Sequence, residues 1–182
     1  MAGNSTLRKL ARAVALISSV GATAGAVRGP LPTSEARQLN DPFLARLTIE
    51  SRRVLFFARE AVSRHGGDKI TPRHLVLGIL RAVPGSIGQF MTSPGWSEQL
   101  IEERFVAMMD GEPLLPESTS IPFASASQLV LDRAAQGADD LGAAVIRPEH
   151  LLLPLLDDDG TKDVLRDAGI TSDRILRYLK QR

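Results

Sequence analysis

Hydrophobic positions along this chain form short stripes at helical spacing, and the stripes return at a constant interval. The segment at 70–77 reads ITPRHLVL and the segment at 146–153 reads IRPEHLLL, so the pattern recurs 76 residues later (146 − 70). Apolar residues at i, i+4 and i+7 precede each segment, from Thr48 to about residue 65 and from the candidate cap Ser125 to about residue 142. A fixed interval of this kind indicates an internal duplication.

Each repeated segment has the features of a buried helix that begins at a proline. Pro72 and Pro148 suit the first helical position, where the missing N–H would have no partner and the fixed φ is already helical. Leu75 and Leu151 then begin a wide apolar face on each helix. Because one helix cannot bury such a face alone, we expect the two copies to pack against each other.

Glycine and proline residues divide each copy into four helices. In the first copy the helices are expected at about 48–65, 71–82, 86–91 and 97–109, and the second copy repeats the series. The sequence therefore predicts an all-α fold of two tandem four-helix repeats, about eight helices related by pseudo-twofold symmetry. The expected boundaries are a tail and linker at 1–42, repeat one at 43–110, a linker at 111–120 and repeat two at 121–182.

Composition narrows the class of protein further. The 182 residues are 43% hydrophobic but only 4% aromatic, so aliphatic side chains must build the core of one domain with an appendage. A net charge of +1 argues against a dedicated nucleic-acid binder, which carries a clustered basic surface. The absence of cysteine excludes disulfides, thiolate metal sites and a thiol nucleophile, which fits a reducing compartment.

The first residues differ from the rest of the chain. Arg8, Lys9 and Arg12 precede an apolar stretch at 13–20, and no acidic residue occurs before Glu35. This order is that of a secretory signal or transit peptide, although the apolar stretch is too short to span a bilayer. A tail of a cytoplasmic protein, a cleaved signal, an anchor and a transit segment all remain open. A cytoplasmic location is the expectation, and residues 1–26 are the only segment expected to reach a membrane.

Two motifs, each present twice, carry a resemblance to a known family. A Val-Leu-x-x-Ala motif begins at Val54 and again at Val130. The His-Leu-Val/Leu-Leu motif begins at His74 and again at His150, each four residues after an isoleucine. At these positions the sequence resembles the Clp N-terminal domain, or Clp repeat, over about residues 43–182. The resemblance implies a pseudo-twofold all-α domain that binds adaptors and substrates and performs no chemistry of its own.

The resemblance also implies partners, since Clp repeats precede the ATPase modules of unfoldases. This chain has no Gly-x-x-x-x-Gly-Lys-Ser/Thr phosphate loop, so it is similar to stand-alone relatives. We therefore expect an accessory, adaptor or decoy factor of a Clp system, without cofactor, whose partners are Clp ATPase or protease subunits, adaptors or substrate proteins. The alternative is an exported or membrane-anchored domain of the same fold with another binding role.

A ligand site also follows from the resemblance. In some members the Glu before each motif His helps to bind phosphorylated arginine, and a carboxylate suits a guanidinium because the two pair in a plane. Glu149 occupies this position in the second repeat, whereas Arg73 occupies it in the first and reverses the charge. The hypothesis is therefore one phosphoarginine-type site at most, at Glu149.

Other candidate residues have plainer explanations. His74 and His150 invite a metal or general-base hypothesis, but each lies in a first helical turn beside leucines, so a structural role is favoured. No catalytic residue and no metal ligand is assigned. Trp96 is either an exposed interface anchor or the cap of a small core. The acidic run at 157–159 is either a solvated helix end or a patch for a basic partner.

Overall fold

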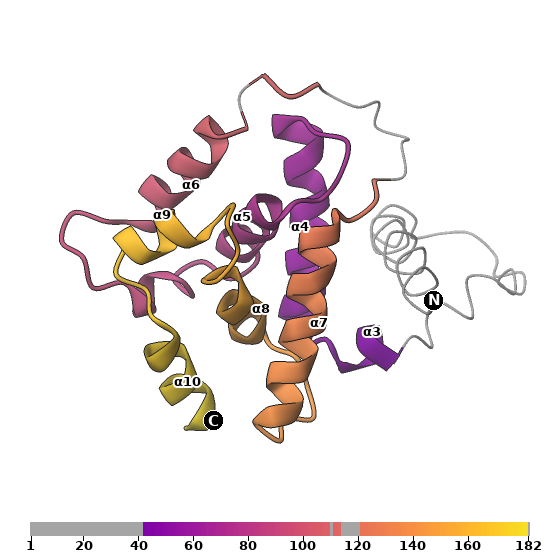
Figure 1. Ribbon diagram of the computed structural model, residues 1–182, viewed down its shortest axis with the longest axis vertical. Helices are drawn as coiled ribbons and strands as arrows, with labels where there is room; N and C mark the ends of the chain where they lie inside the picture. The colour runs from indigo at the N-terminus through magenta and orange to yellow at the C-terminus, as the bar shows by residue number, and fades with distance from the viewer. Residues whose placement is uncertain (1–41, 110, 114–120, 182) are drawn as a thin grey trace, which may run out of the picture.

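The computed structural model describes residues 42–109, 111–113 and 121–181. In these ranges the chain forms eight α-helices and one 3₁₀ turn, with no strand (Figure 1), which confirms the all-α prediction. The elements are α3 (Pro42–Arg46), α4 (Ile49–His65), α5 (Pro72–Ala82), η1 (Gly88–Phe90), α6 (Glu98–Ala107), α7 (Ser125–Asp140), α8 (Pro148–Leu155), α9 (Lys162–Asp167) and α10 (Ser172–Lys180). Within the same ranges, no helix combines the length and apolarity that a bilayer crossing requires. The tail at 1–26 and most of the linker at 111–120 lie outside the described residues.

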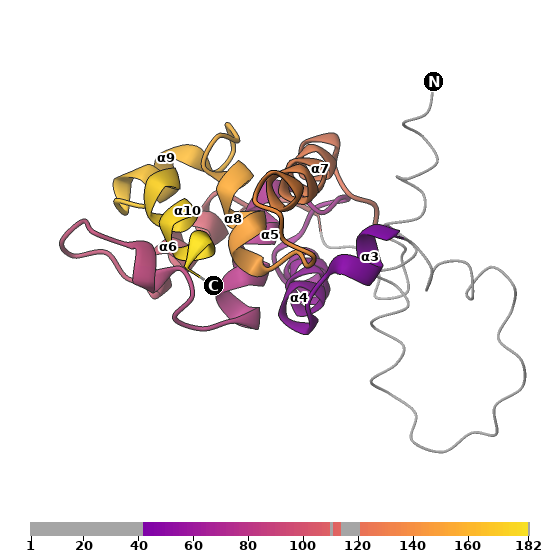
Figure 2. The same cartoon turned by 90° about the horizontal axis from the view of Figure 1, so that it is seen from below.

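The helices repeat in the order that the duplication predicts. Helices α7 and α8 each begin 76 residues after α4 and α5 (125 − 49 and 148 − 72), while α9 and α10 correspond to η1 and α6. In both views α5 and α8 lie at the centre, with α4 and α7 to one side and α6, α9 and α10 to the other (Figures 1 and 2). The two motif helices therefore form the middle of the core, where Leu75 and Leu151 are fully buried.

Two parallel backbone bridges join the repeats crosswise. Leu47, just before α4, pairs with Ile146, just before α8, and Phe123 pairs with Ile70 in the same way. These two bridges are equivalent under the repeat, because 47 and 70 become 123 and 146 when 76 is added. Each bridge thus holds the start of one repeat's first helix against the start of the other repeat's second helix.

A buried serine completes each bridge. The Ser51 hydroxyl donates to the Ile146 carbonyl at 2.7 Å, and the Ser127 hydroxyl donates to the Ile70 carbonyl at 2.7 Å. Both serines are fully buried. Since a buried hydroxyl without a partner costs about 1–3 kcal/mol, each serine favours the arrangement in which the other repeat's carbonyl lies beside it.

The close approach of α4 and α5 depends on one glycine. A Cβ built on Gly78 would lie 2.4 Å from the Val54 carbonyl oxygen and 3.1 Å from the Ala58 Cβ. The matching position in the second repeat is Pro154, inside α8. Proline removes a helical N–H and disfavours continuation, which fits the shorter α8, eight residues against eleven in α5.

Three local details differ from the sequence expectation. Pro42, which the sequence assigns to the linker, begins the short helix α3. The helix expected at 86–91 is a single 3₁₀ turn. The N-cap of α7 is Ala124 rather than Ser125, because the Ala124 N–H donates to the Ile70 carbonyl and so fixes where the helix starts.

Replacing Gly78 with alanine is expected to destabilise the domain by about 1–3 kcal/mol, because the new Cβ would force α4 and α5 apart. Gly137 provides the matched control, since it also lies inside a helix but has no atom within 4 Å of the built Cβ. Gly137→Ala should instead stabilise by about 0.5–1 kcal/mol, the difference in helix propensity. Urea denaturation gives the free energy of unfolding of both variants. A change in the same direction for Gly78→Ala and Gly137→Ala would contradict this account.

Candidate binding site

A groove of about 550 Å³ lies between the two repeats. Its walls come from the first turn of α4, the loop between α5 and η1, the start of α8 and the α10 side chain Tyr178. The backbone bridge between Leu47 and Ile146 holds the start of α4 beside the start of α8. The polar side chains that line the groove are Thr48, Glu50, Ser86, Gln89, Arg147, Glu149 and Tyr178.

A single carboxylate holds the groove loop in shape. Glu98 begins α6, and its carboxylate accepts hydrogen bonds from the backbone N–H groups of Gly85, Ile87 and Gly88 at 2.7, 2.9 and 2.8 Å. Bonds to an ionised acceptor are stronger than neutral ones, so this loop is well ordered. On the opposite side the Tyr178 ring packs edge-on against Phe90 of η1, at 5.4 Å between centroids. The groove is therefore formed before any ligand arrives.

The groove contains two buried polar atoms that lack a partner within the described ranges. One is Oε2 of Glu149, on the first turn of α8, and the other is Oγ of Ser86. A buried acceptor without a donor is costly, and neighbouring atoms cover this oxygen, so a donor from outside the domain would pair with it only after the Glu149 side chain turns toward the groove. A guanidinium or ammonium group provides such a donor together with the opposite charge. Arg147 lines the same groove and places a positive charge beside the carboxylate.

The equivalent position in the first repeat is occupied differently. Arg73 donates from Nη1 to the Met108 carbonyl at 3.0 Å and from Nε to the Gly160 carbonyl at 3.3 Å. Its guanidinium thus ties the end of α6 to the loop before α9. The structure therefore places a carboxylate with a free oxygen in one repeat and an arginine bound to the protein's own carbonyls in the other.

The two motif histidines cap helices. Nδ1 of His74 accepts a hydrogen bond from the Thr71 backbone N–H at 3.1 Å, and Nδ1 of His150 accepts one from the Arg147 N–H at 3.0 Å. This is the bond that a Glu or Gln makes from the same position in a capping box. An imidazole that accepts at Nδ1 must be neutral there, so its proton lies on Nε2.

Burial opposes protonation of both imidazoles. Burial, followed by the charges of His65 and Arg73, lowers the pKa of His74 to about 4, although a backbone hydrogen bond acts in the opposite direction. The pKa of His150 is also lowered, first by burial and then by the positive charge of Arg147. Among the residues that the structure describes, no cluster of three His, Asp or Glu side chains has the arrangement of a metal site.

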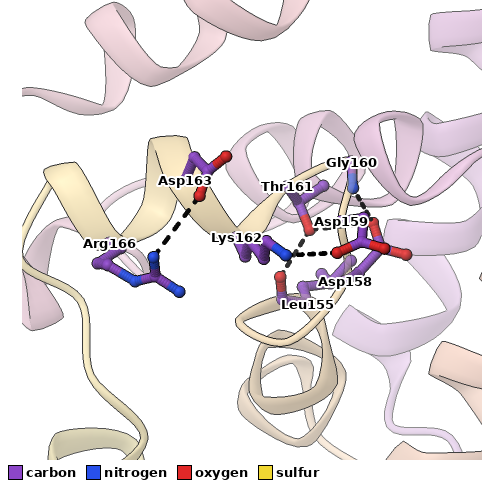
Figure 3. A network of polar contacts seen from close by, with 8 residues as sticks. All are labelled: Leu155, Asp158, Asp159, Gly160, Thr161, Lys162, Asp163 and Arg166. Carbon is purple, nitrogen blue, oxygen red and sulfur yellow. Dashed lines mark hydrogen bonds and ion pairs between the residues drawn. The ribbon is translucent and has the colours of Figure 1, made fainter.

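The acidic run closes the turn between α8 and α9 (Figure 3). Oδ2 of Asp158 accepts from the Gly160 N–H at 2.9 Å, and Asp159 forms an ion pair with Lys162, which lowers the pKa of Asp159. Two of the three carboxylates therefore have local partners. Trp96 is half-buried and packs against the core, and its interface role stays a prediction.

The sequence singled out Glu149 but not the residues that surround it. Ser86 and Tyr178 join Glu149 only through the fold, since neither belongs to a repeated motif. Glu98 also escaped notice, because a surface glutamate at the start of a helix is ordinary in any sequence. The Pro84-Gly85 turn signal before Ser86 marked the loop but not its role in a groove.

Comparison with known proteins agrees with the fold. The family model "Clp repeat (R) N-terminal domain" matches residues 46–168 and 122–181. Chaperone protein ClpD2, chloroplastic, of Oryza sativa subsp. japonica is 28% identical over 137 residues, which are 72% of this chain and 14% of that protein. An uncharacterized protein of Mycobacterium tuberculosis (strain ATCC 25618 / H37Rv) is 27% identical over 150 residues, 79% of this chain and 56% of the relative.

A solved structure has the same arrangement of helices. The N-terminal domain of the caseinolytic protease associated chaperone ClpD from Arabidopsis thaliana superposes with a TM-score of 0.58 at 21% identity. The match covers 75% of this chain and 94% of that one. At this identity the likeness establishes the fold alone, and this chain spans only 14% of the length of the rice ClpD2 protein.

Acid is expected to destabilise the domain through the buried histidines. Because the pKa of His74 is lower in the folded chain than the ordinary 6.5, folding stability is complete above pH 6.5 and falls as the pH drops towards 4, by about 3 kcal/mol in total. His74→Gln keeps the capping acceptor but does not titrate, so its stability should fall less steeply across this window. Denaturant titrations at pH 7, 6, 5 and 4 would decide this. If the unfolding free energy fell equally steeply with decreasing pH in wild type and in His74→Gln, His74 would not be the cause of the acid sensitivity.

Proposed function

Since this chain belongs to the family of Clp repeat N-terminal domains, we propose that it is a non-catalytic binding module that serves a Clp unfoldase or protease as an accessory, adaptor or decoy factor. The family's domains are protein-interaction modules of Clp chaperone systems. The proposed partners are Clp ATPase or protease subunits, adaptors and substrate proteins, in the cytoplasm. No step of this role needs a cofactor or a nucleophile from this chain.

The observation that supports a binding role is the free Glu149 oxygen in a preformed groove. We infer that the groove takes an arginine-type side chain of a client protein, with the guanidinium paired to Glu149. Arg147 lines the same groove, so we propose its guanidinium as the partner of a phosphate on that side chain, and phosphoarginine is the finer proposal. One site is proposed, because Arg73 occupies the equivalent position in the first repeat.

Glu149→Gln is expected to weaken binding of an arginine peptide and of its phosphoarginine form by about tenfold or more, because a hydrogen bond to a charged group contributes about 1.5–3 kcal/mol. Calorimetric titration gives both affinity and stoichiometry. Glu102→Gln, at an exposed position of α6 outside the groove, is the matched control and should bind as wild type does. Equal affinities for wild type and Glu149→Gln would exclude the groove as the site.

The same titration tests the single-site proposal. Arg73→Glu restores a carboxylate in the first repeat and removes the guanidinium that occupies the position. We expect its stoichiometry to rise above the one ligand bound by wild type. Circular dichroism must first show a folded variant, and a folded Arg73→Glu that still binds one ligand would contradict this expectation.

Recovery of Clp subunits with the tagged full-length protein from its native cells is the expected result for the proposed partners. Mass spectrometry of the bait's own N-terminus belongs in the same experiment. An intact residue 1–26 segment together with Clp subunits would agree with the proposal. A bait that begins near Val27 without Clp subunits would favour the alternative, an exported or anchored domain of the same fold, which the basic and apolar tail suggests.

A further inference from the structure

A second surface, on the outward face of α4 and the end of α5, brings two arginines to one aromatic ring and pairs a third with a nearby carboxylate. The guanidinium carbon of Arg81 lies 5.1 Å from the centroid of the Phe57 ring, and that of Arg53 lies 5.8 Å from it. Both distances are within cation–π range. The Phe57 ring itself packs against the core, so the two charges rest on a rigid support.

One carboxylate extends this arrangement. Glu60 accepts from Arg64 at 2.8 Å and from Arg81 at 3.3 Å. The arginine side chains are 53% and 44% exposed, so they remain available to a partner. No carboxylate among the described residues pairs with Arg53. Three positive charges against one negative charge leave a net positive surface, which we name the Phe57 patch (Arg53, Phe57, Glu60, Arg64 and Arg81).

The internal duplication supplies a comparison for this patch. Four of the six buried positions of α4 are identical in α7, where Ser51, Val54, Leu55 and Ala58 correspond to Ser127, Val130, Leu131 and Ala134. The outward positions differ in charge. The residues that correspond to Arg53, Phe57, Glu60, Arg64 and Arg81 are Leu129, Arg133, Gln136, Asp140 and Asp157. The fold therefore requires neither the arginines nor the ring at these positions.

We propose that the Phe57 patch docks an acidic segment of a partner protein. Guanidinium groups pair with carboxylates in a planar geometry. Interface hot spots are also enriched in arginine and aromatic residues. A net charge of +1 does not suit a nucleic-acid binder, which carries a clustered basic surface. The patch shares no residue with the lining of the groove at Glu149, although Glu50 of that lining lies one helical turn before Arg53 on α4.

The test uses the full chain and a short fluorescein-labelled peptide with four glutamates and two leucines, beside the same peptide with glutamines. Fluorescence anisotropy should show binding of the glutamate peptide that weakens as salt is added. The double variant Arg53→Gln/Arg81→Gln should bind at least tenfold more weakly. Arg104→Gln/Arg166→Gln removes the same charge at exposed positions of α6 and α9 and should stay within twofold of wild type.

Glu149→Gln should leave this affinity unchanged, which separates the patch from the proposed groove ligand. Phe57→Leu keeps an apolar side chain but removes the ring beneath the arginines, so it should weaken binding even if the double variant fails to fold. Equal loss in both double variants, equal binding of the glutamine peptide, or tighter binding of oligo(dT) would overturn the proposal. The proposal would also be overturned if wild type self-associated in sedimentation experiments and the double variant Arg53→Gln/Arg81→Gln did not. A second copy of the chain would then cover the patch.

Discussion

The arrangement of the whole domain depends on two carbonyl groups, those of Ile70 and Ile146. Each accepts one hydrogen bond from the backbone just before the other repeat's first helix and one from a buried serine, Ser127 or Ser51. Because these bonds hold the starts of α4 and α8 side by side, the groove beside them exists only when both repeats are folded. Because each repeat supplies the hydrogen-bond donors for the other repeat's isoleucine carbonyl, the two repeats depend on each other to fold.

A symmetric frame supports asymmetric surfaces in this protein. The bridges, serines and capping histidines occur at matched positions in both repeats, and all of them serve folding. The positions that face outward differ between the repeats: Arg73 corresponds to Glu149 before the motif histidine, and Arg53, Arg64 and Arg81 correspond to neutral or acidic residues. A comparison of the two repeats thus separates the positions that packing requires from the outward positions that are free to take a binding role.

The two proposed surfaces have opposite chemistry. The groove presents a carboxylate oxygen that lacks a donor, whereas the Phe57 patch presents guanidinium groups that exceed their carboxylate partners. The groove is partly open, and one of its loops is fixed by Glu98, so we propose that it takes one side chain. The patch is exposed and its exposed charges are screened by salt, so it suits a weaker and broader contact. A client and an adaptor could therefore be held by separate parts of one small domain.

The sequence by itself determined the duplication, the longer helices, the buried leucines and the difference between Glu149 and Arg73. These features are visible because apolar spacing and internal repeats are properties of the order of residues along the chain. Only the tertiary structure decided which atoms meet. The Ser51 hydroxyl finds its acceptor 95 residues away. Ser86, in a loop, and Tyr178, on α10, line the same groove as Glu149. Such contacts depend on how helices pack, and local patterns carry no record of a distant partner.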